Sequence, residues 1–156
     1  MALLTAAAIP GWWSRQRLTS ICAADATLIQ GIQVTVKEQI KEFIKIGCED
    51  AIREVRCNNR PLSSKRLNHH IEIAIGTGLV ARVEKLAQIR GIPLINQQVE
   101  RLTRRCLELE WTVDALSAAK LGVISEQTRL DLINSLVSNQ LADNEEEALR
   151  LLNESE

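Results

Sequence analysis

Apolar residues recur at helical spacing along much of the chain. Between Val36 and Val55 they keep to one face, and the sequence Asn58-Asn59-Arg60-Pro61 ends the pattern. Because residues three and four apart share a helix face, this spacing predicts a helix over residues 36–57. The same reasoning predicts helices over residues 14–29 and 79–90, a further helix that begins at Ser125, and a short last helix that Asp143 caps.

A longer helix is predicted over residues 95–121. Its apolar residues alternate four and three apart, which is typical of a coiled-coil seam. The residues expected to hold two chains together are Val99, Leu102, Cys106, Leu109, Val113 and Leu116. The pattern therefore predicts a homodimer, and the alternative is a long core helix in a monomeric bundle.

Residues 67–86 allow two interpretations. Their apolar residues, spaced three and four apart, fit one continuous helix. Gly76 and Gly78 oppose a helix, because each glycine costs about 0.8 to 1 kcal/mol in a helix interior. Just before them, residues 70–75 alternate with period two and are rich in β-branched side chains, as in a half-buried strand. The pattern slightly favours a short strand over residues 70–75.

The composition agrees with a mainly helical fold. The 156 residues are 46% hydrophobic and include three Trp, one Phe and no Tyr, so aliphatic side chains must fill the core. We predict one domain over residues 1–156, with N-terminal helices in 1–60, a binding and dimerisation region in 61–122 and an acidic helical hairpin in 123–156. Seven Gly and three Pro predict long elements, and no internal repeat is recognised.

No group of residues predicts catalysis or metal binding. The cysteines are scattered, without the two-residue spacing of zinc and redox motifs: Cys22, Cys48, Cys57 and Cys106. Cys48 and Cys106 fall on apolar helix faces and are expected to be buried thiols. The only histidines, His69 and His70, are adjacent and point in different directions. We therefore expect no enzyme activity, no cofactor and no metal.

The first 13 residues are apolar but shorter than the roughly 20 residues that span a bilayer. No basic residue precedes them, as one would in a signal peptide. These features predict a cytoplasmic protein without a transmembrane segment. Trp12 and Trp13, beside Arg15 and Arg17, suit a membrane interface, a groove of a partner or, more commonly, the protein's own fold.

The net charge of −1 combines two opposite halves. Residues 1–105 hold 16 Lys and Arg against 9 Asp and Glu, whereas residues 106–156 hold 3 against 11. A basic half suits a polyanion such as a nucleic acid. The alternative is that both halves are ordinary solvated helix surfaces.

The order of elements over residues 70–105 resembles the ribbon-helix-helix family of dimeric DNA-binding repressors and antitoxins. The resemblance rests on the strand over 70–75, the glycine break, the helix over 79–90, the Arg90-Gly91-Ile92 turn and a second helix. It implies that strands from two chains pair and enter the major groove. His70, Glu72 and Ala74 would then face the DNA, and Ile71, Ile73 and Ile75 the dimer core.

A basic segment precedes this strand, and basic side chains bind phosphates in a salt-dependent way. The predicted nucleic-acid-binding residues are Arg53, Arg56, Arg60, Lys65, Arg66, His70 and Glu72. The sequence thus predicts a nucleic-acid-binding regulatory or accessory protein that acts as a dimer. The alternative is a non-catalytic helical adaptor or assembly factor that binds another protein through the heptad helix and the apolar N-terminus.

Overall fold

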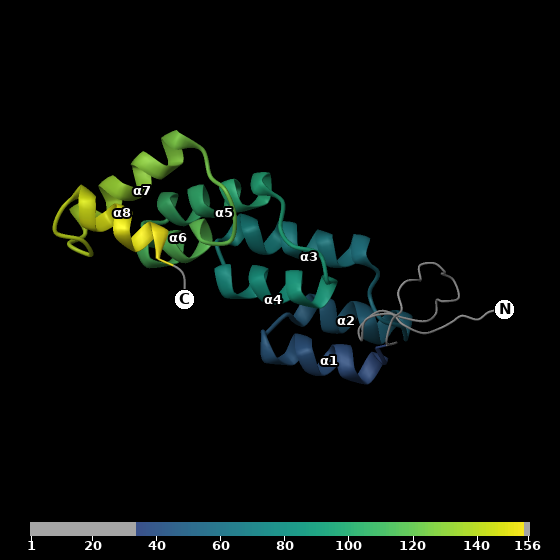
Figure 1. Ribbon diagram of the computed structural model, residues 1–156. Coiled ribbons are helices and arrows are strands. Elements are labelled where there is room, and N and C mark those ends of the chain that lie inside the picture. The colour runs from purple at the N-terminus through teal and green to yellow at the C-terminus, as the bar shows by residue number, and fades with distance from the viewer. Residues whose placement is uncertain (1–33, 155–156) are drawn as a thin grey trace. The chain divides into compact units, whose positions relative to one another are not determined.

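The computed structural model describes residues 34–154, and the predicted helix over residues 14–29 and the Trp12-Trp13 segment lie outside this range. Within the range the chain forms eight α-helices and no strand, which confirms the mainly helical fold (Figure 1). The helices are α1 (Val36–Lys45), α2 (Glu49–Asn58), α3 (Ser64–Thr77), α4 (Val80–Arg90), α5 (Asn96–Glu108), α6 (Thr112–Ala119), α7 (Glu126–Ser138) and α8 (Glu145–Asn153). None of these helices is long and apolar enough to cross a bilayer.

The described residues form two compact units. Unit 1 contains residues 34–71 and 84–92, and unit 2 contains residues 72–83 and 93–154. The boundary between the units therefore passes within α3 and within α4. Charge follows this division: unit 1 holds ten Lys and Arg against six Asp and Glu, and unit 2 holds seven against twelve.

One type of turn ends the first helix of each successive pair. In all four turns a residue with positive φ follows the helix: Gly47, Gly78, Glu110 and Gln140. That residue donates its N–H to the carbonyl oxygen three positions earlier, and the next residue donates to the carbonyl oxygen five positions earlier, with N···O distances of 2.9 to 3.2 Å. These two hydrogen bonds define the Schellman motif, which satisfies the last carbonyls of a helix.

The four turns reveal a structural repeat of helical hairpins. The positive-φ residues are 31, 32 and 30 positions apart, and the same register positions are buried in every hairpin. The residues four positions before the positive-φ residue are Phe43, Ala74, Cys106 and Leu136. Those eight positions before it are Gln39, His70, Leu102 and Leu132. Those eight positions after it are Val55, Leu86, Ala118 and Ala148. Because these side chains differ widely in size and polarity, the repeat is not visible as sequence similarity. The backbone nevertheless repeats, and the prediction of no internal repeat was wrong in this respect.

Two predicted long helices are each broken by one of these turns. The helix predicted over residues 36–57 is divided at Gly47, which has φ 67°, into α1 and α2. The helix predicted over residues 95–121 is divided at Glu110, which has φ 62°, into α5 and α6. A left-handed residue stops the α-helical hydrogen bonds, so the chain reverses while the apolar spacing continues. The expectation of long elements was therefore wrong.

The strand predicted over residues 70–75 is wrong, because these residues lie within α3. Ile71, Ala74 and Ile75 are buried, whereas Ile73 is exposed, so burial follows the helical spacing and not period two. A Cβ at Gly76 would meet nothing within 4 Å, so this glycine sits in the helix without a packing role. The strand that, by the ribbon-helix-helix resemblance, would enter the major groove is therefore absent from residues 70–75.

Two predicted helix ends agree with the structure, and one predicted cap is wrong by one residue. The predicted helix over residues 79–90 forms as α4 and is followed by Gly91 with φ 80°. Ser125 caps α7 and accepts a hydrogen bond from the N–H of Thr128. The cap of α8 is Asn144 and not the predicted Asp143, because the Asn144 side chain accepts from the N–H of Glu147.

Candidate functional site

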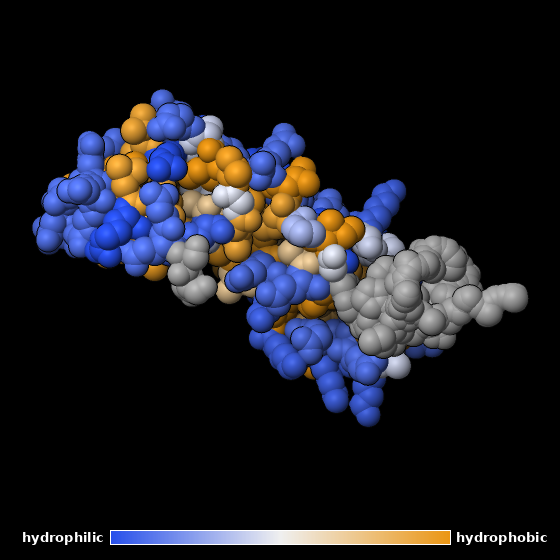
Figure 2. All heavy atoms as spheres, in the orientation of Figure 1, coloured by the Kyte–Doolittle hydropathy of each residue, from blue (hydrophilic) through white to orange (hydrophobic). Residues whose placement is uncertain are grey.

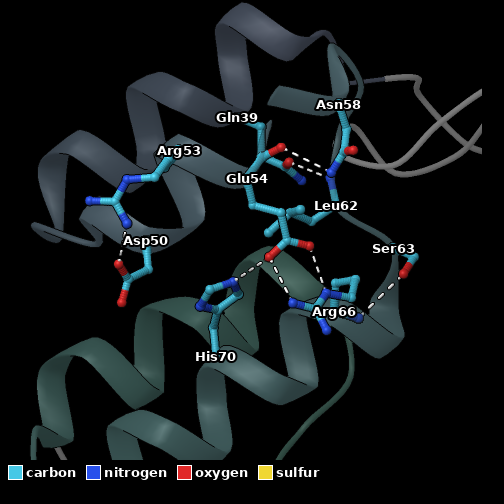
Figure 3. Close-up of polar contacts among 9 residues, drawn as sticks. All are labelled: Gln39, Asp50, Arg53, Glu54, Asn58, Leu62, Ser63, Arg66 and His70. Atoms are coloured by element: carbon cyan, nitrogen blue, oxygen red, sulfur yellow. Dashed lines mark hydrogen bonds and ion pairs between the residues drawn. The ribbon is translucent and has the colours of Figure 1, made fainter. Parts of the chain in front are cut away.

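Two of the predicted nucleic-acid-binding residues belong to a polar cluster centred on Glu54 of α2 (Figure 3). Arg66 Nε and Nη2 donate to the Glu54 carboxylate at 2.6 and 3.0 Å, and His70 Nε2 lies 3.1 Å from Glu54 Oε1. The hydrogen bond from Arg66 lowers the pKa of Glu54, and Glu54 in turn raises the pKa of Arg66. His70 is also buried. The side chains of Arg66 and His70 therefore join α3 to α2 within unit 1 through their contacts with Glu54.

Arg53 and Glu72 also have partners within the protein. Arg53 Nη1 donates to Asp50 Oδ1 at 2.8 Å on the surface of α2. In unit 2, Glu72 accepts hydrogen bonds from Gln98 Nε2 and Arg101 Nη2, each at 2.7 Å. Glu72 therefore joins α3 to α5, and its carboxylate is not free to contact DNA bases.

The remaining predicted cations are free. Arg56, Arg60 and Lys65 are exposed, and none of them forms a hydrogen bond or ion pair through its side chain with the residues that the structure describes. They lie at the end of α2, in the loop that follows it and at the start of α3. Of the seven predicted residues, these three remain available to an external anion.

The predicted dimer seam is divided between the core and the surface of unit 2. Val99, Leu102 and Cys106 are completely buried, Leu109 and Leu116 are half-buried, and Val113 is 61% exposed. Burial raises the pKa of the Cys106 thiol to about 11, and the nearby Asp114 adds to this shift. The three buried residues belong to the core of one chain, so the six residues do not form one surface for a second chain.

Comparisons with protein-family models, with curated proteins and with solved structures find no match to this chain. Among residues 34–154 no three His, Cys, Asp or Glu side chains come together in a way that could hold a metal ion.

A polar network around Glu100 joins α5 to the start of α7 in unit 2. The carboxylate accepts hydrogen bonds from Ser125 N at 2.7 Å, Ser125 Oγ at 2.8 Å, Arg104 Nε at 2.8 Å and Thr128 Oγ1. Partial burial alone would raise the pKa of Glu100, but the hydrogen bonds from Thr128, Ser125 and Arg104 outweigh it and lower the pKa to about 2. Every donor is a group of the chain itself, so this carboxylate serves the fold.

The lowered pKa of Glu100 predicts a loss of stability in acid. The contribution is complete above the ordinary pKa of 4.5 and is lost as the pH falls through the folded value of about 2. Glu100→Gln should therefore flatten the dependence of the unfolding free energy on pH between about 5 and 2, as measured by urea denaturation. Glu110→Gln, an exposed carboxylate without an ion pair in the described chain, is the control and should keep the full dependence. An unchanged dependence in Glu100→Gln would contradict the network.

The sequence reasoning missed a set of exposed apolar residues that occupy the same position in three successive hairpins. The residue directly after the positive-φ residue is Leu79, Trp111 or Leu141, with exposed fractions of 38%, 41% and 42%. In the first hairpin this position is Cys48, which is buried. We call Leu79, Trp111 and Leu141 the turn ridge. All three belong to unit 2.

Contacts within unit 2 place Trp111 beside the turn at Gly78 and hold the start of α6 against the end of α7. A Cβ built on Gly78 would lie 3.2 Å from Trp111 Cζ3, so the indole covers the turn that precedes Leu79. Thr112 Oγ1 lies 2.7 Å from Ser135 Oγ and accepts from Asn139 Nδ2 at 2.8 Å, which holds the start of α6 against the end of α7. Trp111 and Leu141 therefore flank this polar contact.

Other exposed apolar residues of unit 2 include Val113, which is close to the turn at Glu110, and residues that lie away from the turns. On the face shown in Figure 2, apolar surface gathers over α7 and the loop before it, where Val123 and Leu130 are exposed, whereas hydrophilic residues cover α8. Val123 N donates to Asn96 Oδ1 at 3.2 Å, so this loop is fixed to the start of α5. Val123 directly follows Gly122, as the exposed Ile92 directly follows Gly91, so this position recurs in two hairpins. The turn ridge recurs in three.

Proposed function

We propose that the protein is a non-catalytic helical-repeat adaptor that binds another protein through the turn ridge. The observation that carries this proposal is the recurrence of a large, exposed apolar residue at one register position of three hairpins. Stacked helical repeats present equivalent positions side by side, and such proteins bind partners along these surfaces. A cytoplasmic location, as the sequence predicts, is part of the proposal.

The chemistry of the turn ridge suits a protein interface. Trp is among the residues that contribute most to binding when an interface buries it, and contiguous exposed apolar side chains mark interaction surfaces. Trp111 projects at a turn that backbone hydrogen bonds hold in place, so little conformational entropy is lost when a partner covers it.

Photocrosslinking tests this proposal. A benzophenone amino acid placed at Leu79 or Leu141 should give a defined adduct with a partner protein in cells. The matched control is Leu130 in α7, which is 47% exposed but lies away from the turns. Adducts from the two ridge positions and none from Leu130 are the expected result. Equal adducts from all three positions, or none from the ridge, would contradict it.

A second candidate function is nucleic-acid binding by unit 1. It is favoured by the three exposed cations Arg56, Arg60 and Lys65, which have no ion pair in the described chain, and by the excess of basic residues in this unit. The strand that the ribbon-helix-helix resemblance implies for base reading is absent, because residues 70–75 are helical. The candidate therefore depends on the contacts of these three cations with phosphates, which carry no sequence information.

Replacing Arg56, Arg60 and Lys65 together with glutamine tests the second candidate. If these cations bind phosphates, affinity weakens equally on all sequences, and the slope of log affinity against log salt falls by about 0.9 for each phosphate that is no longer neutralised. Arg53→Gln is the control, because Arg53 is already paired with Asp50. Gel-shift titrations of duplex DNA at two salt concentrations give the slopes. An unchanged slope in the triple variant would exclude this candidate.

A further inference from the structure

We infer that the turn ridge binds a basic amphipathic helix of the partner protein. This inference rests on the proposed adaptor function and adds the chemistry of the partner. It follows from the charges around the ridge and from the spacing of its residues.

The turns that carry Trp111 and Leu141 are strongly acidic. Residues 107–114 and 137–147 contain seven carboxylates and no Lys or Arg. We call this set the acidic rim, and its members are Glu108, Glu110, Asp114, Asp143, Glu145, Glu146 and Glu147. A surface with an apolar centre and a rim of one charge selects a partner with apolar anchors and the opposite charge around them.

Most carboxylates of the acidic rim are free to pair with a partner. Glu108 is paired with Arg105, and Glu147 is paired with Arg150. The side chains of the other five are exposed and form no ion pair within residues 34–154. Two of the five flank the indole closely in the sequence, since Glu110 precedes Trp111 directly and Asp114 follows it on the first turn of α6.

The spacing of the turn ridge suits a helix that crosses the hairpins. Helices that pack side by side lie about 8 to 10 Å apart. Since α5 packs against α7, we expect equivalent residues of neighbouring hairpins to be separated by a similar distance. Seven residues of an α-helix rise about 10 Å. Apolar residues at every seventh position of a partner helix therefore meet successive ridge residues, and Lys or Arg beside them meet the acidic rim.

A designed peptide tests this inference with the full chain. The probe is a labelled helical peptide of about 20 residues with leucine at every seventh position and lysine on both sides of each leucine. The comparison peptides replace lysine with glutamate or scramble the order of the lysine peptide. Fluorescence anisotropy should show that the lysine peptide binds at least about tenfold more tightly than either one, and more weakly as salt increases.

Variants of the chain separate the ridge from the rim. Trp111→Ala should weaken binding of the lysine peptide about 30-fold, as expected for a central aromatic anchor. Leu141→Ser provides a second ridge variant in case the indole is needed for folding, and circular dichroism measures the helical content of each. Glu110→Gln with Asp114→Asn should weaken binding about fivefold and reduce its salt dependence. Glu126→Gln, at the opposite end of α7, should leave binding unchanged.

Three results would overturn the inference: equal binding of the glutamate peptide, equal binding of the scrambled peptide, or no effect of the rim variant. If ridge positions still crosslink to a partner but the lysine peptide does not bind, the basic helix is excluded and the adaptor function stands. If neither crosslinking nor peptide binding occurs, both proposals fail.

Discussion

Leu102→Ala is expected to lower the free energy of unfolding by about 3 kcal/mol without changing the oligomeric state. Leu102 is completely buried in unit 2, at the register position eight residues before the turn that is buried in every hairpin. Truncation removes its buried methyl groups and leaves a cavity, which costs about 2 to 5 kcal/mol in comparable cores. Urea denaturation gives the free energy, and light scattering gives the mass.

The control for Leu102 is Val113, because both residues belong to the predicted seam. Val113 is 61% exposed, so Val113→Ala should change the unfolding free energy by less than about 0.5 kcal/mol. An intermolecular seam would give a different result: Leu102→Ala would convert a dimer into a monomer, and Val113→Ala would weaken the same dimer.

Gly78→Ala is expected to lower the free energy of unfolding by about 2 kcal/mol, because a left-handed backbone disfavours a Cβ and the added atom is crowded. Gly78 has φ 74°, and the new Cβ would lie 3.0 Å from Leu109 Cδ1 and 3.2 Å from Trp111 Cζ3. The Schellman hydrogen bonds fix this backbone, so it cannot relax without breaking the turn. Thermal and urea denaturation measure the change.

Gly76→Ala is the matched comparison and should have the opposite sign. Gly76 lies within α3, and its added Cβ would meet nothing within 4 Å. Alanine favours a helix interior by about 1 kcal/mol over glycine, so the unfolding free energy should rise by up to this amount. If both substitutions destabilise the protein equally, the assignment of Gly76 to a helix and Gly78 to a turn is incorrect.

The site residues show why the sequence alone could not tell which side chains are available to a partner. Arg56 and Arg66 look equivalent in the sequence, yet Arg66 is bound to Glu54, twelve positions away, and Arg56 is exposed without an ion pair in the described chain. Trp111 lacked any local signal, because its importance depends on sharing a register position with Leu79 and Leu141. That register becomes visible only when the turns are known.

The turns themselves divide into those that the sequence marks and those that it hides. The end of α4 was predicted, because Gly91 directly follows the predicted helix over residues 79–90 and Pro93 lies two positions further on. At Glu110 and Gln140 ordinary side chains adopt positive φ, and no glycine marks the turn. Left-handed backbone costs about 1 to 2 kcal/mol at such residues, and packing of the hairpin must compensate for it.

The sequence by itself determined the helical class, the helix ends at Gly91 and Ser125, and the burial of Cys48 and Cys106. These features depend on interactions within a few residues, where helical spacing and capping act. Only the tertiary structure decided that residues 70–75 are helical, that the runs over 36–57 and 95–121 reverse, and that Arg66 is paired with Glu54. These outcomes depend on contacts between residues far apart in the chain, because a local pattern of apolar residues is the same whether a helix continues or turns back on itself.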